Sequence, residues 1–191
     1  MALTLEPELH PAPRADEDLA LLVRAIHQAG IVVADAPRSA DSRAALRAAL
    51  AGARLAELRE GVWARPDNLG DLPAAVPSAT ADALQWFRTT PDGDPVALAA
   101  RLWPLADWSA RAGELVARMA GLVGPLEAGE PDVLADGFVL SADVLRHVQA
   151  DPLLPPALLP PDWPGPHLRT TYDRYDAAYR TTLGTWLTST D

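Results

Sequence analysis

The sequence contains no cysteine and no lysine among its 191 residues. Without cysteine the chain can form no disulfide, no thiolate nucleophile and no cysteine-ligated zinc site. All 16 basic residues are arginine, they are outnumbered by 26 acidic residues, and the net charge is -10. This charge disfavours a free-standing protein that binds the phosphate backbone of nucleic acid. The exclusive use of arginine, together with abundant alanine, is typical of a GC-rich genome.

Long apolar runs and catalytic signatures are missing too. No run reaches the roughly 18 to 20 residues that a membrane span needs, and residues 1–15 lack the apolar core of a signal peptide. There is no GxSxG, Walker or GxGxxG motif, and no pair among the 4 histidines has the spacing of metal ligands. We therefore expect a cytoplasmic protein that is not an enzyme and has no catalytic residue, metal or cofactor.

The first part of the chain alternates short apolar runs with helical patterns. Residues 1–15 are expected to be a disordered arm, followed over residues 16–30 by a helix that Gly30 ends. β-Branched or alternating runs predict strands at residues 31–34, 54–58, 62–65 and 84–88. Helical patterns lie between them at residues 39–51 and 73–83, the second interrupted by prolines. The order β-α-β-β-α-β predicts a ferredoxin-like domain over residues 16–90.

The pattern becomes helical over residues 91–191. Helices are expected to begin at Pro95, before Trp108 and at Pro131, with Gly124-Pro125 ending the second of them. The third is expected to bury Leu134, Phe138, Leu145 and Val148. A proline-dense linker at residues 151–166 leads to a last helix with the apolar stripe Leu168, Tyr172, Tyr175, Tyr179, Leu183 and Trp186. The overall prediction is an α+β fold, with a ferredoxin-like domain followed by an all-helical domain.

Candidate binding residues lie in the basic segment 38–65, which holds 6 of the 16 arginines. Guanidinium groups match phosphate oxygens, so an anionic effector is one interpretation, and a solvated face paired with nearby acids is the other. The candidate effector-binding residues are Arg43, Arg47, Arg59, Trp63 and Arg65. Asp35, at the end of the first strand, is either a cation ligand or a turn residue, and we favour the turn because one carboxylate rarely holds a catalytic Mg²⁺.

Aromatic residues offer a second set of candidates. Of the 6 tryptophans, Trp86, Trp103 and Trp108 are expected in the core, and Trp163 is expected to pack a rigid loop. The tyrosine stripe of the last helix fits either a core or a partner surface. Tyr172, Tyr175 and Tyr179 are therefore the candidate dimer-interface residues.

Two segments resemble the PaaX family of bacterial transcriptional repressors, known for phenylacetic acid catabolism. One is REGVWARPDNL at residues 59–69, and the other is DPLLPPALLPPDWPG at residues 151–165, followed by Tyr172-Asp173. The resemblance extends over roughly residues 30–188. The second segment is the more specific, and it supplies the candidate structural motif Asp151, Pro152, Leu159, Pro160, Asp162, Trp163, Pro164 and Gly165.

The resemblance implies a repressor-type protein that dimerises and responds to an acyl-CoA such as phenylacetyl-CoA, without catalysis. Members of the family have a winged helix that binds DNA, a ferredoxin-like domain similar to a CRISPR-associated nuclease, and a helical C-terminal domain. This chain departs from the pattern at its front, because residues 1–30 offer one helix and an arm, too little for a winged helix.

The leading hypothesis is a PaaX-like regulatory protein without its own DNA-binding domain, acting in effector sensing or dimerisation. Its partner would be a second copy or a full-length PaaX-like paralogue. The alternative is a stand-alone acyl-CoA-binding protein. An enzyme hypothesis, a metal-dependent nuclease that uses Asp35, ranks below both, and a mis-assigned start of the gene is a further interpretation.

Overall fold

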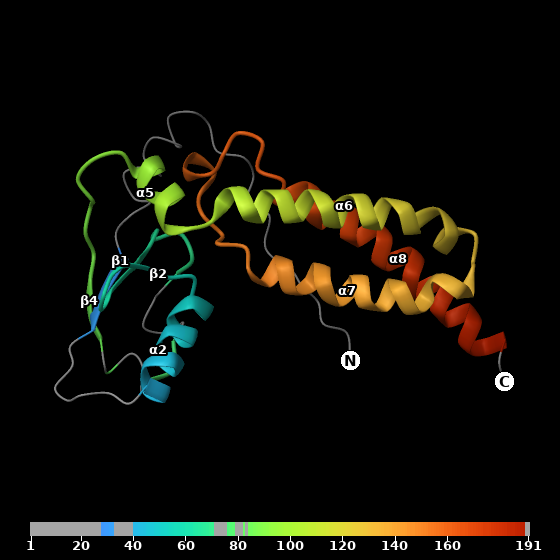
Figure 1. Cartoon of the computed structure of the whole chain (residues 1–191), viewed down its shortest axis with the longest axis horizontal. Helices are drawn as coiled ribbons and strands as arrows, with labels where there is room; N and C mark the ends of the chain where they lie inside the picture. Colours follow the sequence, from blue (N-terminus) through green and yellow to red (C-terminus); the bar gives the residue numbers. More distant parts are fainter. Residues whose placement is uncertain (1–27, 33–39, 71–75, 79–81, 83, 190–191) are drawn as a thin grey trace. The chain divides into compact units, whose positions relative to one another are not determined.

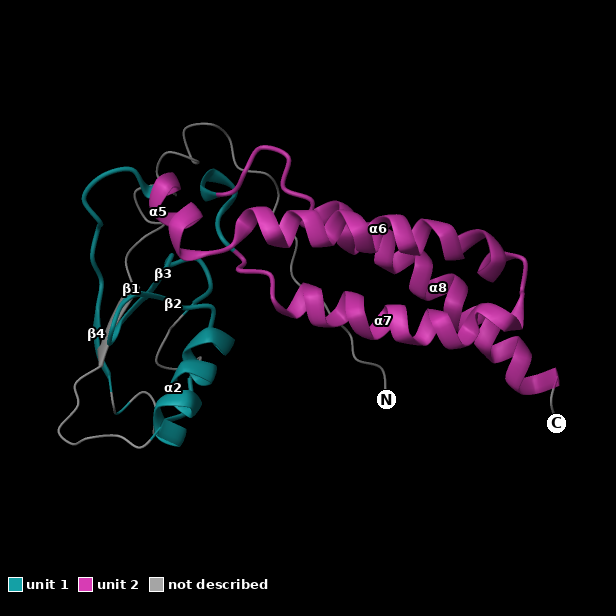
Figure 2. Ribbon diagram, in the orientation of Figure 1, with its two compact units in different colours: residues 1–95, 154–158 teal, residues 96–153, 159–191 magenta. Residues whose placement is uncertain are grey.

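The computed structural model describes the backbone of residues 28–32 and, in full, residues 40–70, 76–78, 82 and 84–189. The chain divides into two compact units, which Figure 2 distinguishes by colour. The first contains residues 1–95 and Leu154–Leu158, and the second contains Val96–Leu153 and Leu159–Asp191. The sequence predicted a single boundary near residue 90 and did not predict that Leu154–Leu158 belongs to the first unit.

A four-stranded antiparallel sheet forms the centre of the first unit. Its strands are β1 (Gln28–Val32), β2 (Ala56–Arg59), β3 (Val62–Arg65) and β4 (Leu84–Phe87), and helix α2 (Ala40–Gly52) follows β1 along the chain. The strand order is β2-β3-β1-β4, and every neighbouring pair is antiparallel (Figure 1). A short turn joins β2 to β3, where Gly61 has a φ of 74°, a conformation that glycine adopts without strain.

One face of this sheet carries the core of the first unit. Trp63 of β3 and Leu84 of β4 are buried together with Leu50 of α2, Leu55 and Val76. In the register of the sheet, Gly30 of β1 lies between Trp63 and Trp86, its partners on the two neighbouring strands. A residue without a side chain at this position leaves room for the two indoles.

The sequence placed the first strand too late. β1 begins at Gln28, so Gly30 lies inside a strand and does not end a helix. Pairing with β3 and β4 on both sides outweighs the local preference of glycine for a helix end. The remaining strands and the helix at residues 39–51 are confirmed to within two residues.

Several expectations lie outside the described residues. They concern the arm at residues 1–15, residues 16–27 of the helix expected over 16–30, and Asp35. The helix expected at residues 73–83 is described only in part, where Asp82 N–H donates to Ser78 O over 2.8 Å. A mixed α and β fold with a small antiparallel sheet and a helical C-terminal region is confirmed. The ferredoxin-like arrangement stays a prediction.

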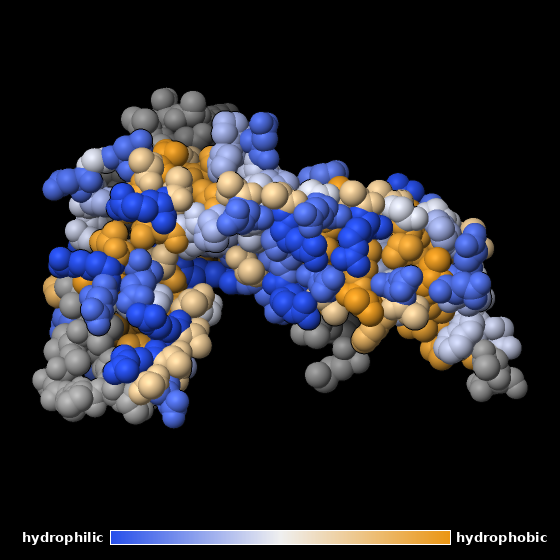
Figure 3. Space-filling view, viewed as in Figure 1, coloured by the Kyte–Doolittle hydropathy of each residue, from blue (hydrophilic) through white to orange (hydrophobic). Residues whose placement is uncertain are grey.

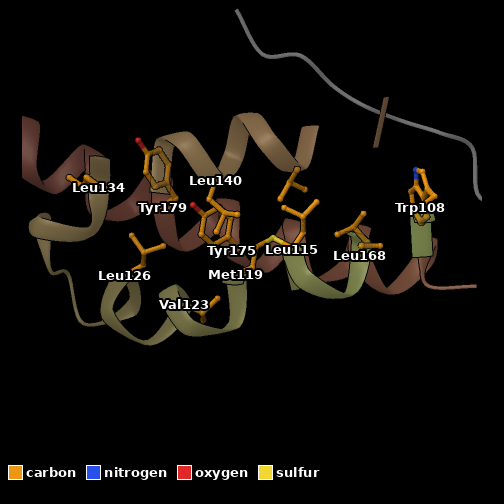
Figure 4. Close-up of a cluster of buried hydrophobic side chains, with 12 residues drawn as sticks. Trp108, Leu115, Met119, Val123, Leu126, Leu134, Leu140, Leu168, Tyr175 and Tyr179 are labelled. Atoms are coloured by element: carbon orange, nitrogen blue, oxygen red, sulfur yellow. The ribbon is translucent and has the colours of Figure 1, made fainter. Parts of the chain in front are cut away.

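The second unit is built from three long helices around one core. These are α6 (Leu105–Glu127), α7 (Leu134–Gln149) and α8 (Gly165–Ser189), preceded by α5 (Pro95–Leu102). Short 3₁₀ turns, η1 (Pro131–Val133) and η2 (Pro156–Leu158), lie in the connections, η2 within the segment assigned to the first unit. Figure 4 shows the core cluster of the three helices, with Trp108 at one end and Leu134 at the other.

Two expectations for these helices are wrong. α6 continues through Pro125 to Glu127, although Pro125 has no N–H to donate to the carbonyl of Gly121. Phe138 of α7 is 67% exposed, although it was expected in the core. The buried face of α7 is instead Leu134, Gly137, Leu140 and Val144.

Gly137 explains how α7 approaches α8 so closely. A Cβ atom at this position would lie 2.9 Å from the ring of Tyr179, a distance that real Cβ contacts do not reach. The carbonyl oxygen of Gly137 also accepts a hydrogen bond from the hydroxyl of Tyr175 over 2.6 Å. Apolar periodicity in the sequence marks large side chains and therefore gives no sign of this position.

We predict that Gly137→Ala destabilises the protein by about 1–3 kcal/mol, because the added methyl group overpacks the contact with Tyr179. The matched control is Gly113→Ala in α6, where a Cβ atom would meet nothing within 4 Å. There alanine is expected to stabilise the helix by about 0.5–1 kcal/mol. Urea unfolding measures both changes, and a Gly137→Ala protein as stable as the original would contradict the prediction.

Candidate functional site

The candidate effector residues separate into an exposed group and a buried group. Arg43, Arg47 and Arg59 are exposed, and Arg47 Nη2 lies 3.3 Å from Glu57 Oε2. Trp63 and Arg65 are 6% and 3% exposed and face the interior of the first unit. The structure therefore does not bring the five residues together at one surface.

Arg65 has a structural role that the sequence did not reveal. Its Nη1 donates to Ala53 O and its Nη2 donates to Gly70 O, both over 2.9 Å. The guanidinium group thus ties the end of β3 to the turns on either side of it in the chain. Strand alternation gave a hint, because Trp63 and Arg65 lie two residues apart and so point to the same face.

The acid at the start of the proline-rich segment is also buried. Asp151 is 2% exposed, and its Oδ2 accepts a hydrogen bond from Arg169 Nη2 of α8 over 2.6 Å. Its Oδ1 accepts from the backbone N–H of Leu153 over 2.9 Å, and Leu153 has the unusual φ of 54°. Asp151 therefore both fixes the turn after α7 and binds α8.

Three stacked rings connect the helices at the same end of the unit. The ring centroids of His147 and Trp108 are 4.4 Å apart, and those of Trp108 and Trp163 are 4.5 Å apart. Trp108 Nε1 donates to His147 O over 3.2 Å, and His147 Nε2 lies 3.0 Å from Trp108 O. Because a carbonyl oxygen only accepts, the His147 Nε2 atom carries the proton in this contact.

Gly165 is the residue that brings Trp163 close to α8. A Cβ atom at Gly165 would lie 2.6 Å from Trp163 Nε1, so the side chain of any other residue would collide with the indole. Trp163 N–H donates to Pro160 O over 3.0 Å, and Pro164 O accepts from Leu168 N–H over 2.8 Å at the start of α8. Trp163 thus packs the proline-rich segment against Trp108 of α6, and the rigidity of that segment stays a prediction.

The rest of the motif divides between interior and surface. Pro152 is buried, Leu159 and Pro164 are half-buried, and Pro160 and Asp162 are exposed. The segment is thus held at its two ends, by Asp151 and by Trp163 with Gly165, while its middle reaches the surface.

The tyrosine stripe of α8 forms core, which corrects the interface interpretation. Tyr175 has no exposed surface, and Tyr179 is 9% exposed. Burial raises the pKa of the hydroxyls of Tyr175 and Tyr172. Only Tyr172, which is half-buried, retains surface that a partner could contact. These tyrosines are buried because α8 packs against both α6 and α7.

An arginine cluster on α6 and α7 was not anticipated. Asp143 Oδ2 lies 3.2 Å from Arg118 Nη1 and 3.7 Å from Arg111 Nη2, and its Oδ1 lies 3.1 Å from Arg146 Nη1. Hydrogen bonding from Arg118 is the largest influence holding the pKa of the Asp143 carboxyl below its usual range. The sequence held two signals for this cluster: Arg111 and Arg118 lie two helical turns apart on one side of α6, and Asp143 and Arg146 have the i,i+3 spacing of a helical ion pair.

The residues that the structure describes form neither a metal-ligand cluster nor a helix that could span a membrane. No group of three or more His, Asp or Glu side chains there is arranged to hold a metal ion. No helix among the same residues combines the length and apolar character required to cross a membrane.

Comparison with known proteins gives a family match and matches among solved structures. Residues 103–187 match the family model described as PaaX-like protein C-terminal domain. Among solved structures, the chain is similar to "Uncharacterized protein Rv0674 from Mycobacterium tuberculosis", with 33% sequence identity and a TM-score of 0.66. That alignment covers 90% of this chain and 70% of the other. No curated protein matches the sequence.

The position of His147 predicts a dependence of stability on pH. Burial is the largest influence on its pKa and lowers it from the usual 6.5. The unfolded chain therefore binds a proton at His147 more readily than the folded chain does. The contribution to stability is complete above the unfolded pKa and is lost as the pH falls from there to the lower folded pKa.

We expect the melting temperature to fall as the pH is lowered through that window, and we expect this slope to be smaller in His147→Gln. Thermal unfolding followed by circular dichroism at a series of pH values measures both slopes. Exposed His167, which both proteins retain, cancels in the comparison. Equal slopes in the two proteins would refute the assignment to His147.

Proposed function

We propose, since this chain belongs to the PaaX-like family, that it is a transcriptional regulatory protein that works by associating with a second copy or with a DNA-binding member of the family. The observation that carries the proposal is the family match over residues 103–187. That range contains α6, α7 and all but the last two residues of α8, and therefore the buried core cluster of the second unit.

The residues behind the family likeness support a scaffold for association rather than a reaction centre. Asp151, Trp163 and Gly165 hold the three helices together through buried contacts. A unit of this kind presents its exposed helix faces to partners. We accordingly place the regulatory contacts on the surface of α6 and α7 and not on the buried tyrosines of α8.

The finer points of the proposal concern location, fold and pathway. We propose a cytoplasmic repressor whose first unit has the ferredoxin-like arrangement, in agreement with the strand order β2-β3-β1-β4. Phenylacetate catabolism is the pathway for which the family is known, and a regulator of an aromatic-acid pathway is the specific form that we propose.

A second candidate function is the binding of an acyl-CoA effector such as phenylacetyl-CoA. The observation in its favour is that Arg43, Arg47 and Arg59 remain exposed on α2 and β2. Arg43 and Arg47 lie one helical turn apart, so their guanidinium groups can reach one phosphate group together. Trp63 and Arg65 are no longer part of this candidate, because both are buried.

The direct test mixes this chain with a full-length DNA-binding PaaX-type protein on its operator. A two-fold operator is bound by both subunits of a dimeric repressor. Replacing one of these subunits by this chain is therefore expected to weaken operator binding at least tenfold. Fluorescence anisotropy of labelled operator DNA measures the change. Two results together would contradict the proposal. The operator affinity would be the same with and without this chain, whether or not phenylacetyl-CoA is present, and the two proteins would elute separately in size-exclusion chromatography.

A further inference from the structure

A shallow groove of about 500 Å³ lies between α6 and α7. Its floor is apolar and is formed by Ala117, Gly121 and Leu122 of α6 with Val139 and Leu140 of α7. Val139 is 57% exposed and supplies apolar surface to the groove. The groove belongs entirely to the second unit.

The α6 side of the groove is open to close approach. A Cβ atom at Gly121 would meet nothing within 4 Å, so no packing inside the unit requires glycine there. Glycine in the middle of a helix costs about 0.5–1 kcal/mol relative to alanine. A surface with Ala117 and Gly121 lets another backbone or side chain come near the axis of α6.

One end of the groove is positively charged. Arg118 lines the groove, and Arg111 and Arg146 converge with it on Asp143. Glu114 also binds Arg111, over 2.7 Å. Three guanidinium groups against two carboxylates leave an excess of positive charge here, in a chain whose net charge is -10.

The other end is negatively charged. Asp136 lines the groove there, and Glu130 and Asp132 precede it at the turn between the two helices, exposed to solvent. None of these three acids forms an ion pair with another residue that the structure describes. Figure 3 shows hydrophilic side chains over the middle of α6 and α7 and hydrophobic ones beside them, towards the turn between α6 and α7.

We propose that a second copy of this chain docks on the α6–α7 groove about a two-fold axis that passes near Val139. Under such an axis each surface meets itself in the opposite direction, so the positive end of one copy faces the negative end of the other. Asp132 and Arg146 lie equally far along the chain from Val139, on opposite sides of it. The apolar floors meet at the centre, where Val139 is buried.

This inference rests on the proposed function, in which the chain acts through association, and it names the surface that would serve. The opposite charges at the two ends favour a second copy over an unrelated partner. A partner with one sign of charge would match only one end, and like charges placed in contact are repelled.

The first experiment tests the apolar centre. Val139→Asp is expected to weaken self-association at least tenfold in sedimentation velocity, because a charge would be buried where the two grooves meet. The matched control is Phe138→Ser, which removes the neighbouring side chain, itself 67% exposed and not part of the groove. The control is expected to associate as the original protein does, and the circular dichroism of both variants shows whether they fold.

The second experiment tests the charged ends by exchange. Asp132→Arg and Arg146→Glu are each expected to weaken self-association at least fivefold, whereas an equimolar mixture of the two is expected to recover it. In the mixed dimer one contact joins the two introduced charges and the other joins the unchanged Asp132 and Arg146. Asp173→Arg, an equal charge change at an exposed position of α8, is the control and is expected to have no effect.

Three results would overturn the proposed surface. They are a chain that stays monomeric at every concentration, a Val139→Asp protein that associates normally, and a mixture that fails to recover association. A monomer that still weakens operator binding by a full-length family member would leave the proposed function intact. A protein that dimerises through the groove but leaves operator binding unchanged would contradict the proposed function and support the proposed surface.

Discussion

The stack of His147, Trp108 and Trp163 is the interaction on which the second unit depends. It joins the first turns of α6, the last turns of α7 and the segment immediately before α8 in one column of rings, with centroid separations of 4.4 and 4.5 Å. The two hydrogen bonds between Trp108 and His147 run in opposite directions and fix both rings. Because these contacts set where α8 begins, they also set where Leu168, Tyr175 and Tyr179 enter the core.

The ion pair between buried Asp151 and partly exposed Arg169 acts at the same end of the unit. Removing Arg169 would leave the buried charge of Asp151 without its partner, so this pair constrains the direction of the segment after α7. The family resemblance thus arises mainly from residues that shape the scaffold. The features proposed to bind partners, the charged ends and apolar floor of the α6–α7 groove, lie elsewhere and left no recognisable motif in the sequence.

Sequence reasoning worked where one local signal dominated. The turn at Gly61 and the alternation around it placed the β2–β3 hairpin, and helical spacing placed the inward face of α8. It failed where a contact with a distant part of the chain, and not the local sequence, decided which residue is buried. Phe138 and Gly137 are neighbours in α7, and the ring of Tyr179 together with the hydroxyl of Tyr175 selects the glycine for the interior. Arg65 is buried because two carbonyl oxygens from different turns accept its protons, a pairing that no spacing rule reveals.

The measurement that tests this account most directly is a double-mutant cycle between Trp108 and Trp163. Trp108→Leu, Trp163→Leu and the double variant are unfolded in urea, and their free energies of unfolding are compared with that of the original protein. If the stack holds the linker to the helices, the two substitutions are coupled by about 0.5–1.5 kcal/mol or more, as expected for aromatic pairs. Substitutions that add to within about 0.3 kcal/mol would show that the two indoles act independently and would contradict the account.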